Sequence, residues 1–303
     1  MSRNRLLSTI TFILSTVPCD GHSGALHNHH DDPMPPGTTQ SPNPPHCVTY
    51  DLCSKRDGPE DEMLYMPCLN STTAVPMTDW VSLRILNRLC PTFMAEQGAV
   101  PHPPLCCSRS QVRVILKSMT MPKDLLGNCP TCLSNFKEFW CRQACAPDQS
   151  NFEVAHRLTG DESWRRRKRE LPIVNGDAVS QIDVHVAQDY LDRIFESCRD
   201  VQFPAFGTTA VTLMCGGRED CTPNAWYAFM GDPEENQYVP FKFNFITKPG
   251  SAPVRPLNAT TFTCDQAVDG MDKCPCEECK AACPAEPDST TEITETETET
   301  IEQ

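Results

Sequence analysis

The chain has 303 residues, including 19 Cys and 28 Pro, and its 26 basic and 40 acidic side chains give a formal net charge of -14. This acidic balance argues against a nucleic-acid partner, because a protein that neutralises phosphates needs a basic face. No uninterrupted apolar run of about 18 residues is present, so the sequence predicts no membrane span in this chain.

The N-terminal segment, residues 1–25, has the pattern of a secretory signal peptide. A basic start precedes the short apolar stretch from Leu6 to Val17, and small residues suited to cleavage follow up to Ala25. Cleavage would remove Cys19 and leave an even 18 cysteines, which suits a fully paired disulfide framework in an oxidising compartment. The sequence therefore predicts a protein of the secretory pathway.

Residues 26–46 are rich in Pro and His and predict a linker, since such a segment cannot bury enough apolar surface to fold. The cluster from His27 to Asp32 contains metal-ligating residue types, but a polar tract without fixed geometry is more often solvated, so we expect no metal there. The cysteines then extend from Cys47 to Cys283, a length suited to one domain with its own core.

The first features of this domain are a sequon and a helix. Asn70 begins an Asn-Ser-Thr sequon, which predicts a glycosylated surface position in this compartment. Thr78 or Asp79 can cap a helix that runs to about Leu89, because apolar residues then recur on one side.

A second helix is expected to begin at Ser108. Gln111, Ile115 and Ser118 follow at helical spacing and share one stripe, which borders a neighbouring apolar stripe. The pattern therefore places a polar Gln among apolar neighbours.

A basic run from Arg165 to Arg169 follows Gly160 and precedes Pro172, which predicts an exposed loop. Two interpretations of this run stay open. It can serve as an extended site for a proprotein convertase, or it can be an ordinary solvated loop.

The second half of the domain adds a helix and a strand. A helical pattern extends from Ala187 to Cys198, whereas Phe241, Phe243 and Phe245 alternate with polar residues as in a half-buried strand. The fold class is therefore α+β, a single disulfide-rich domain that is mostly helical with a small β-sheet.

The C-terminal part holds a second sequon and an acidic tail. Asn258 begins an Asn-Ala-Thr sequon, a second predicted glycosylation position. Residues 284–303 repeat Thr and Glu without any Lys or Arg, which predicts a disordered acidic tail.

Known catalytic motifs are missing from the sequence: it has no G-x-S-x-G, H-E-x-x-H, Walker or G-x-G-x-x-G pattern. Cys129 and Cys132 have the spacing of a redox motif, and the run from Cys274 to Cys279 resembles a zinc-binding cysteine cluster. Because most cysteines of an oxidising compartment are bridged, we expect structural disulfides at both places. The residues thus predict a binding module, not an enzyme, with no cofactor and no metal.

The cysteine spacing and the sequence between the cysteines resemble the N-terminal lumenal domain of the Niemann-Pick type C protein 1 family over residues 47–283. The adjacent pair Cys106-Cys107 and the stretch from Cys129 to Phe152 carry much of this resemblance. All mature cysteines have a place in the pattern, and we expect all of them in disulfides: Cys47, Cys53, Cys68, Cys90, Cys106, Cys107, Cys129, Cys132, Cys141, Cys145, Cys198, Cys215, Cys221, Cys264, Cys274, Cys276, Cys279 and Cys283.

The resemblance implies a domain that holds a cholesterol-like sterol in a deep apolar pocket and contacts its 3β-hydroxyl. It also implies delivery by a small soluble lumenal carrier of the Niemann-Pick type C protein 2 kind, and a location in the lysosomal or endosomal lumen or outside the cell. A buried sterol suits such a pocket, because each buried CH₂ contributes about 0.8 kcal/mol and a buried hydroxyl needs a partner.

The resemblance also implies site residues. Gln111 matches the family's hydroxyl-binding glutamine, four residues after the adjacent cysteine pair. The other implied pocket or entrance positions are Ile115, Ser118, Pro122, Trp140, Leu213, Met214, Pro240, Phe241 and Phe243.

Three departures fall on the polar end of the implied pocket. Pro67 stands where the family has an asparagine that shares the sterol hydroxyl, Thr49 replaces a tryptophan, and Leu52 replaces an acidic residue. Either Tyr65, Asn70 or a water molecule replaces the missing partner, or the polar group of the ligand differs, or the affinity is lower.

Other functions stay open at this point. The chain can be a carrier of a different lipid, a protein-interaction ectodomain that kept the scaffold, or a redox enzyme that uses Cys129 and Cys132 as free thiols. Whether it is a complete soluble protein or a fragment of a membrane transporter is also open, because the family continues through many membrane spans.

Overall fold

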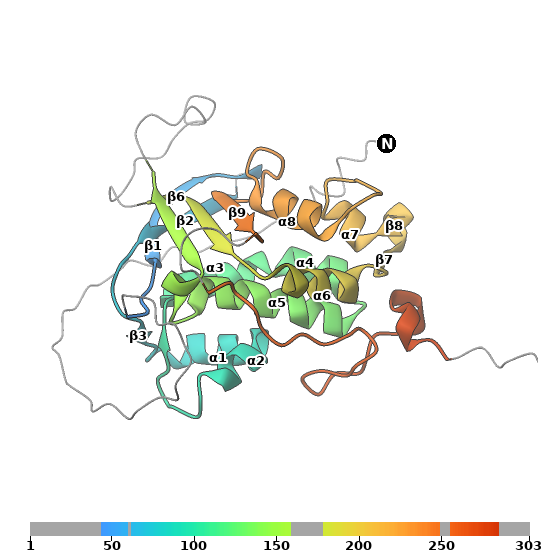
Figure 1. The fold of residues 1–303 in the computed structure, drawn as a ribbon, viewed down its shortest axis with the longest axis horizontal. Coiled ribbons are helices and arrows are strands. Elements are labelled where there is room, and N and C mark those ends of the chain that lie inside the picture. The colour runs from blue at the N-terminus through green and yellow to red at the C-terminus, as the bar shows by residue number, and fades with distance from the viewer. Residues whose placement is uncertain (1–43, 60–61, 159–177, 249–254, 285–303) are drawn as a thin grey trace, which may run out of the picture.

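The computed structural model describes residues 44–59, 62–158, 178–248 and 255–284, and its fold is α+β, as predicted (Figure 1). The predicted signal segment, most of the linker, the run from Arg165 to Arg169 and the acidic tail beyond Pro284 lie outside the described residues. Within the described part of the chain, no helix combines the length and the apolar character that crossing a bilayer requires.

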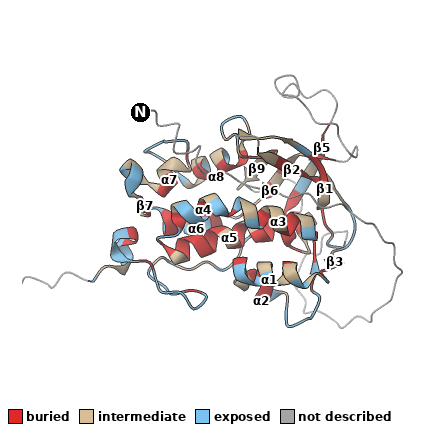
Figure 2. Ribbon diagram, turned by 180° about the vertical axis from the view of Figure 1, so that it is seen from behind, coloured by how far each residue is buried: buried red, intermediate tan, exposed pale blue. Residues whose placement is uncertain are grey.

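Helix α5 (Pro130–Cys145) lies at the centre of the molecule and is buried along most of its length (Figure 2). Two further helices, α3 (Arg109–Ser118) and α4 (Thr120–Leu126), form a broken pair beside it, and α6 (Gln188–Cys198) packs along another side. The outer helices are α1 (Trp80–Leu89) and α2 (Pro91–Glu96) on one side and α7 (Ala210–Leu213) and α8 (Pro223–Gly231) on the other.

Most strands gather at one end of the helical body (Figure 1). Strands β1 (Thr49–Asp57) and β2 (Met63–Leu69) form an antiparallel hairpin, and the three-stranded sheet has the order β5 (Glu153–Arg157), β6 (Val179–His185), β9 (Lys242–Ile246). In that sheet β5 is antiparallel and β9 parallel to β6. Two short pairs complete the strands: β3 (Val75–Pro76) with β4 (Pro104–Leu105), and β7 (Gln202–Phe203) with β8 (Thr208–Thr209). The short strands β7 and β8 lie beside α7 at the other end of the helical body (Figure 1).

Four predicted elements are confirmed by the structure. Helix α1 follows Asp79, whose carboxylate accepts a hydrogen bond of 2.9 Å from the Ser82 amide. Helix α3 follows Ser108, as expected. Helix α6 and strand β9 coincide with the predicted third helix and the Phe-rich strand to within one residue at each end.

Helix α5 escaped the sequence analysis because its buried positions do not form one stripe. Apolar Phe136 and Phe139 are buried on it together with polar Asn135, Glu138 and Arg142. A helix that is buried on nearly all sides loses the amphipathic pattern that identifies surface helices.

All 18 cysteines from Cys47 to Cys283 form disulfides, as predicted, and none of them pairs within a C-x-x-C motif. Cys129 and Cys132 are bridged to different, distant residues, so this motif is not a dithiol pair. The nine bridges are Cys47–Cys106, Cys53–Cys68, Cys90–Cys141, Cys107–Cys145, Cys129–Cys274, Cys132–Cys198, Cys215–Cys221, Cys264–Cys279 and Cys276–Cys283.

Candidate functional site

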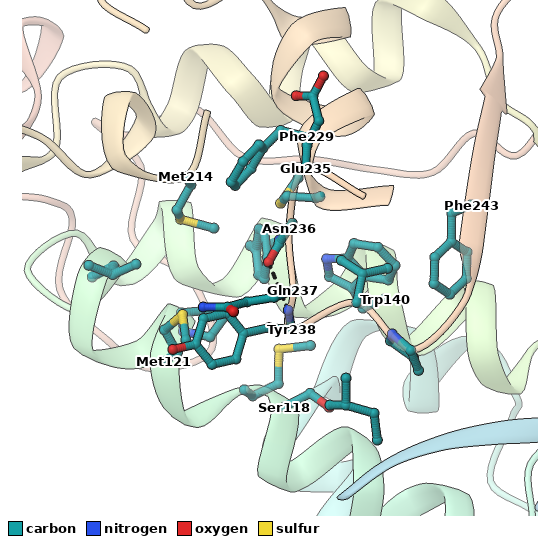
Figure 3. Close-up of a pocket in the computed structure, with 18 of the residues that line it drawn as sticks. Ser118, Met121, Trp140, Met214, Phe229, Glu235, Asn236, Gln237, Tyr238 and Phe243 are labelled. Atoms are coloured by element: carbon teal, nitrogen blue, oxygen red, sulfur yellow. Dashed lines mark hydrogen bonds between the residues drawn. The ribbon is translucent and has the colours of Figure 1, made fainter. Parts of the chain in front are cut away.

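A cavity of about 1250 Å³ lies between the helices α3, α4 and α5 on one side and the β1–β2 hairpin, α7, α8 and the loop 232–241 on the other. Its volume exceeds the ~300–1,000 Å³ of typical ligand pockets. Figure 3 shows labelled side chains from these elements around it, with Met121 and Phe243 on opposite sides of the view and Trp140 between β9 and the loop.

The structure brings all ten sequence-predicted site residues to this one cavity. They come from five separate parts of the chain, so no local pattern required them to meet. The ten lining residues are Gln111, Ile115, Ser118, Pro122, Trp140, Leu213, Met214, Pro240, Phe241 and Phe243.

Aromatic rings make up much of the wall on the side of β9. The Trp140 and Phe243 rings meet edge to face with centroids 5.4 Å apart, and Phe241 and Phe243 are 4.5 Å apart. Such pairs hold their rings in defined orientations. The cavity therefore has a preformed apolar wall suited to a flat apolar ligand.

Gln111 lies at the polar end of the cavity with 7% of its surface exposed. Its Oε1 accepts hydrogen bonds from the backbone amides of Asp51 at 2.6 Å and Ser108 at 2.9 Å, while the Ser108 side chain caps the Gln111 amide. This capping box commits the oxygen of the side chain to the protein. The Nε2 group has no hydrogen bond to a described residue and is left as a donor toward the cavity.

A bulge in β1 brings the backbone amide of Asp51 to Oε1 of Gln111. The register between β1 and β2 shifts between Thr49 and Leu52, and Asp51 has a φ of 64°, a backbone conformation that is uncommon outside glycine. The Asp51 carboxylate accepts hydrogen bonds from the hydroxyls of Ser108, at 2.9 Å, and Ser110. Sequence analysis missed Asp51, because its role depends on a bulge that no local motif announces.

The residues that depart from the family pattern also line the cavity. Thr49, Leu52, Tyr65 and Pro67 all line it. Asn70 does not; its side-chain oxygen accepts a hydrogen bond of 2.6 Å from the Thr72 amide instead. Of the side chains considered as replacements for the missing asparagine, only Tyr65 is therefore in place.

Two charged contacts border the cavity that sequence analysis did not identify. Lys117 and Glu62 form an ion pair of 3.2 Å. Arg56 on β1 donates from Nε to the Pro240 carbonyl at 2.8 Å and from Nη2 to the Val239 carbonyl. This guanidinium ties the loop 232–241 to the β-hairpin.

Comparison with known proteins places this architecture in a family. The family described as the Niemann-Pick C1 N terminus matches residues 44–302. The chain belongs to this family.

Its relatives carry the names of cholesterol transporters. NPC1-like intracellular cholesterol transporter 1 is 31% identical over 251 residues in Rattus norvegicus and 30% identical over 252 residues in Homo sapiens. NPC intracellular cholesterol transporter 1 from Sus scrofa is 27% identical over 247 residues. Each match covers 80% of this chain but only 17% or 18% of the relative, so the chain spans less than a fifth of their length.

Family and disulfides together fit an extracytoplasmic domain of the secretory pathway, since nine bridges form and persist in oxidising compartments. Asn258, in the second sequon, is exposed and accepts a hydrogen bond of 2.8 Å from Arg193. Glycosylation of Asn70 and Asn258 stays a prediction, as do the domain boundaries.

Proposed function

We propose that this domain binds a cholesterol-like sterol in the cavity, with its hydroxyl end at Gln111. The observation that carries the proposal is the convergence of all ten implied site residues on one large apolar cavity with a buried amide donor at its end. Membership in the Niemann-Pick C1 N-terminal family, whose relatives are named cholesterol transporters, supports it.

Physical chemistry favours such a ligand. Burial of the ring system against Trp140, Phe241 and Phe243 contributes about 0.8 kcal/mol for each CH₂ removed from water. The Nε2 donor of Gln111 would remain unsatisfied beside a ligand without a polar end, at a cost of about 1–3 kcal/mol. The site thus favours a flat apolar lipid with one small polar end.

The domain functions, in this proposal, in the lysosomal or endosomal lumen or outside the cell. A small soluble sterol carrier of the Niemann-Pick type C protein 2 kind supplies the ligand. The basis is the family relationship together with a cavity bordered by charged residues of the loop 232–241, Glu234 and Glu235. Transfer of labelled sterol from such a carrier to this chain, measured against spontaneous release from the carrier, tests this part.

Equilibrium binding of labelled cholesterol to the secreted, oxidised chain tests the main proposal. We expect saturable one-to-one binding that unlabelled sterols with a free 3β-hydroxyl displace. Absence of sterol binding by correctly oxidised protein would contradict it. The same assay with other lipids, and capture of protein partners on the same surface, would then test the lipid-carrier and interaction-domain alternatives.

A further inference from the structure

The polar end of the cavity is held together by two disulfides. Cys47–Cys106 and Cys107–Cys145 join the start of β1, the segment before α3 and the end of α5, with Cα–Cα distances of 5.2 and 4.7 Å. The Cys106 amide also donates to the Cys145 carbonyl at 3.0 Å. Three chain segments that are distant in sequence are therefore fixed side by side at this point.

Each of these segments presents a polar side chain to the cavity close to its bridged cysteine. Thr49 follows Cys47 by two residues, Gln111 follows Cys107 by four, and Gln143 precedes Cys145 by two. All three line the cavity. They therefore belong to the same end of it, where Leu52 and Pro67 contribute only apolar surface.

Gln149 fixes Thr49 to the last turn of α5. Its Oε1 accepts from the amides of Val48 at 3.0 Å and Thr49 at 3.2 Å, while its Nε2 donates to the carbonyls of Gln143 at 3.1 Å and Ala144 at 3.2 Å. Gln149 contacts Gln143 only at its backbone carbonyl, so this bridge does not involve the Gln143 side chain. Since Gln143 lies three residues after Trp140, both project from one face of α5.

The Gln143 side chain, 5% exposed, lies beside a second buried polar group. The carboxyl group of Glu153 on β5 is 2% exposed and has its side chain next to Gln143, yet neither of its oxygens has a well-formed hydrogen bond to a described residue. Burial raises the pKa of Glu153 well above its ordinary value. Whether protonated or ionised, this carboxyl group has an oxygen that can accept from the Gln143 Nε2.

We propose that Gln143 is a second specificity-determining residue, whose Oε1 accepts the hydrogen of the ligand's hydroxyl, and that Glu153 is the positioning residue that turns this amide. This inference rests on the proposed sterol function. Gln111 offers only a donor to the cavity, so with Gln143 as acceptor the site matches a hydroxyl, which both accepts and donates. A ketone only accepts, and it would leave the Gln143 oxygen unsatisfied.

Binding of cholestanol and of the corresponding 3-ketone to the oxidised chain tests the inference. We expect the wild type to prefer the hydroxyl by about tenfold or more. Gln143→Leu should lower the affinity for the hydroxyl about tenfold and leave that for the ketone nearly unchanged, so that the preference disappears. Gln143→Met provides a second variant of similar length, and Gln202→Leu, on the exposed face of β7, is the matched control.

The role of Glu153 is tested by the same ratio, that of the affinities for cholestanol and for the 3-ketone. Glu153→Gln keeps an acceptor oxygen and should retain the preference for the hydroxyl, whereas Glu153→Leu should lose it. If the wild type binds neither sterol, the proposed function itself fails. If the wild type binds and folded Gln143→Leu or Gln143→Met keeps the preference, sterol binding stands and this inference is overturned.

Discussion

The backbone amide of Asp51 donates a hydrogen bond of 2.6 Å to Oε1 of Gln111. Together with the bond from the Ser108 amide, it saturates the oxygen, so that Nε2 is the hydrogen-bonding group that this cavity-lining side chain has left to offer. The same side chain thus completes the cap of α3 and, in the proposed function, supplies the donor for the sterol hydroxyl.

This double role dictates how Gln111 should be tested. Gln111→Glu keeps an oxygen for the Asp51 and Ser108 amides but removes the donor, so we expect a folded protein whose sterol affinity falls about tenfold. Gln111→Ala removes both functions and should also lower the free energy of unfolding by about 0.5–2 kcal/mol. Equilibrium sterol binding and chemical denaturation measure the two effects. Undiminished binding by Gln111→Glu would remove this residue from the site.

Removal of Arg56 should loosen the loop 232–241. Its guanidinium bonds to the Val239 and Pro240 carbonyls, both of which belong to cavity-lining residues. Because the loop then opens more easily, Arg56→Met should raise the sterol dissociation rate about three- to tenfold. Stopped-flow release of a fluorescent sterol measures it. Lys55→Met, at the exposed neighbouring position of β1, is the control and should release sterol at the wild-type rate.

Stability should be higher at acidic pH because α5 and β5 bury carboxyl groups. Burial raises the pKa of Glu138 from 4.5 to about 7, against the backbone hydrogen bonds from Phe93 and Thr92 that favour the ionised form. Between these values the folded protein binds more protons than the unfolded chain, so the free energy of unfolding falls as pH rises from about 4.5 to about 7. The raised pKa of Glu153 acts in the same direction.

Urea unfolding at several pH values between 4.5 and 7.5 measures this dependence, which we expect to amount to about 1–3 kcal/mol for Glu138. Glu138→Gln cannot ionise and should flatten part of the slope, and adding Glu153→Gln should flatten it further. A stability that rises with pH across this range, or a slope that both substitutions leave unchanged, would contradict the assignment.

The native protein should contain no free thiol between Cys47 and Cys283. Mass spectrometry after alkylation without reduction should detect none, and peptide mapping should link Cys129 to Cys274 and Cys132 to Cys198. Loss of the Cys129–Cys274 bridge should cost about 2–5 kcal/mol of stability. A reducible Cys129–Cys132 pair would revive the redox alternative.

The sequence by itself determined the features that depend on neighbouring residues. Asp79 and Ser108 cap helices because their side chains bond to amides three residues away, and these starts were predictable. The even number of mature cysteines and their spacing were enough to predict the family and a domain in which every cysteine is bridged. Gln111 became a candidate through the family resemblance, which places the implied glutamine four residues after Cys107, and its role in the site stays a prediction.

Only the tertiary structure decided which cysteines pair and which polar side chains meet. Eighteen cysteines allow very many connectivities, and the choice of Cys107–Cys145 follows from packing of α3 against α5. Gln143 carried no signal, because a polar residue on a helix that is buried nearly all round looks like any surface residue in sequence. Its place beside Glu153, and in the same cavity as Gln111, results from contacts between residues distant in sequence. Burial of the whole core offsets the loop-closure entropy that such contacts cost.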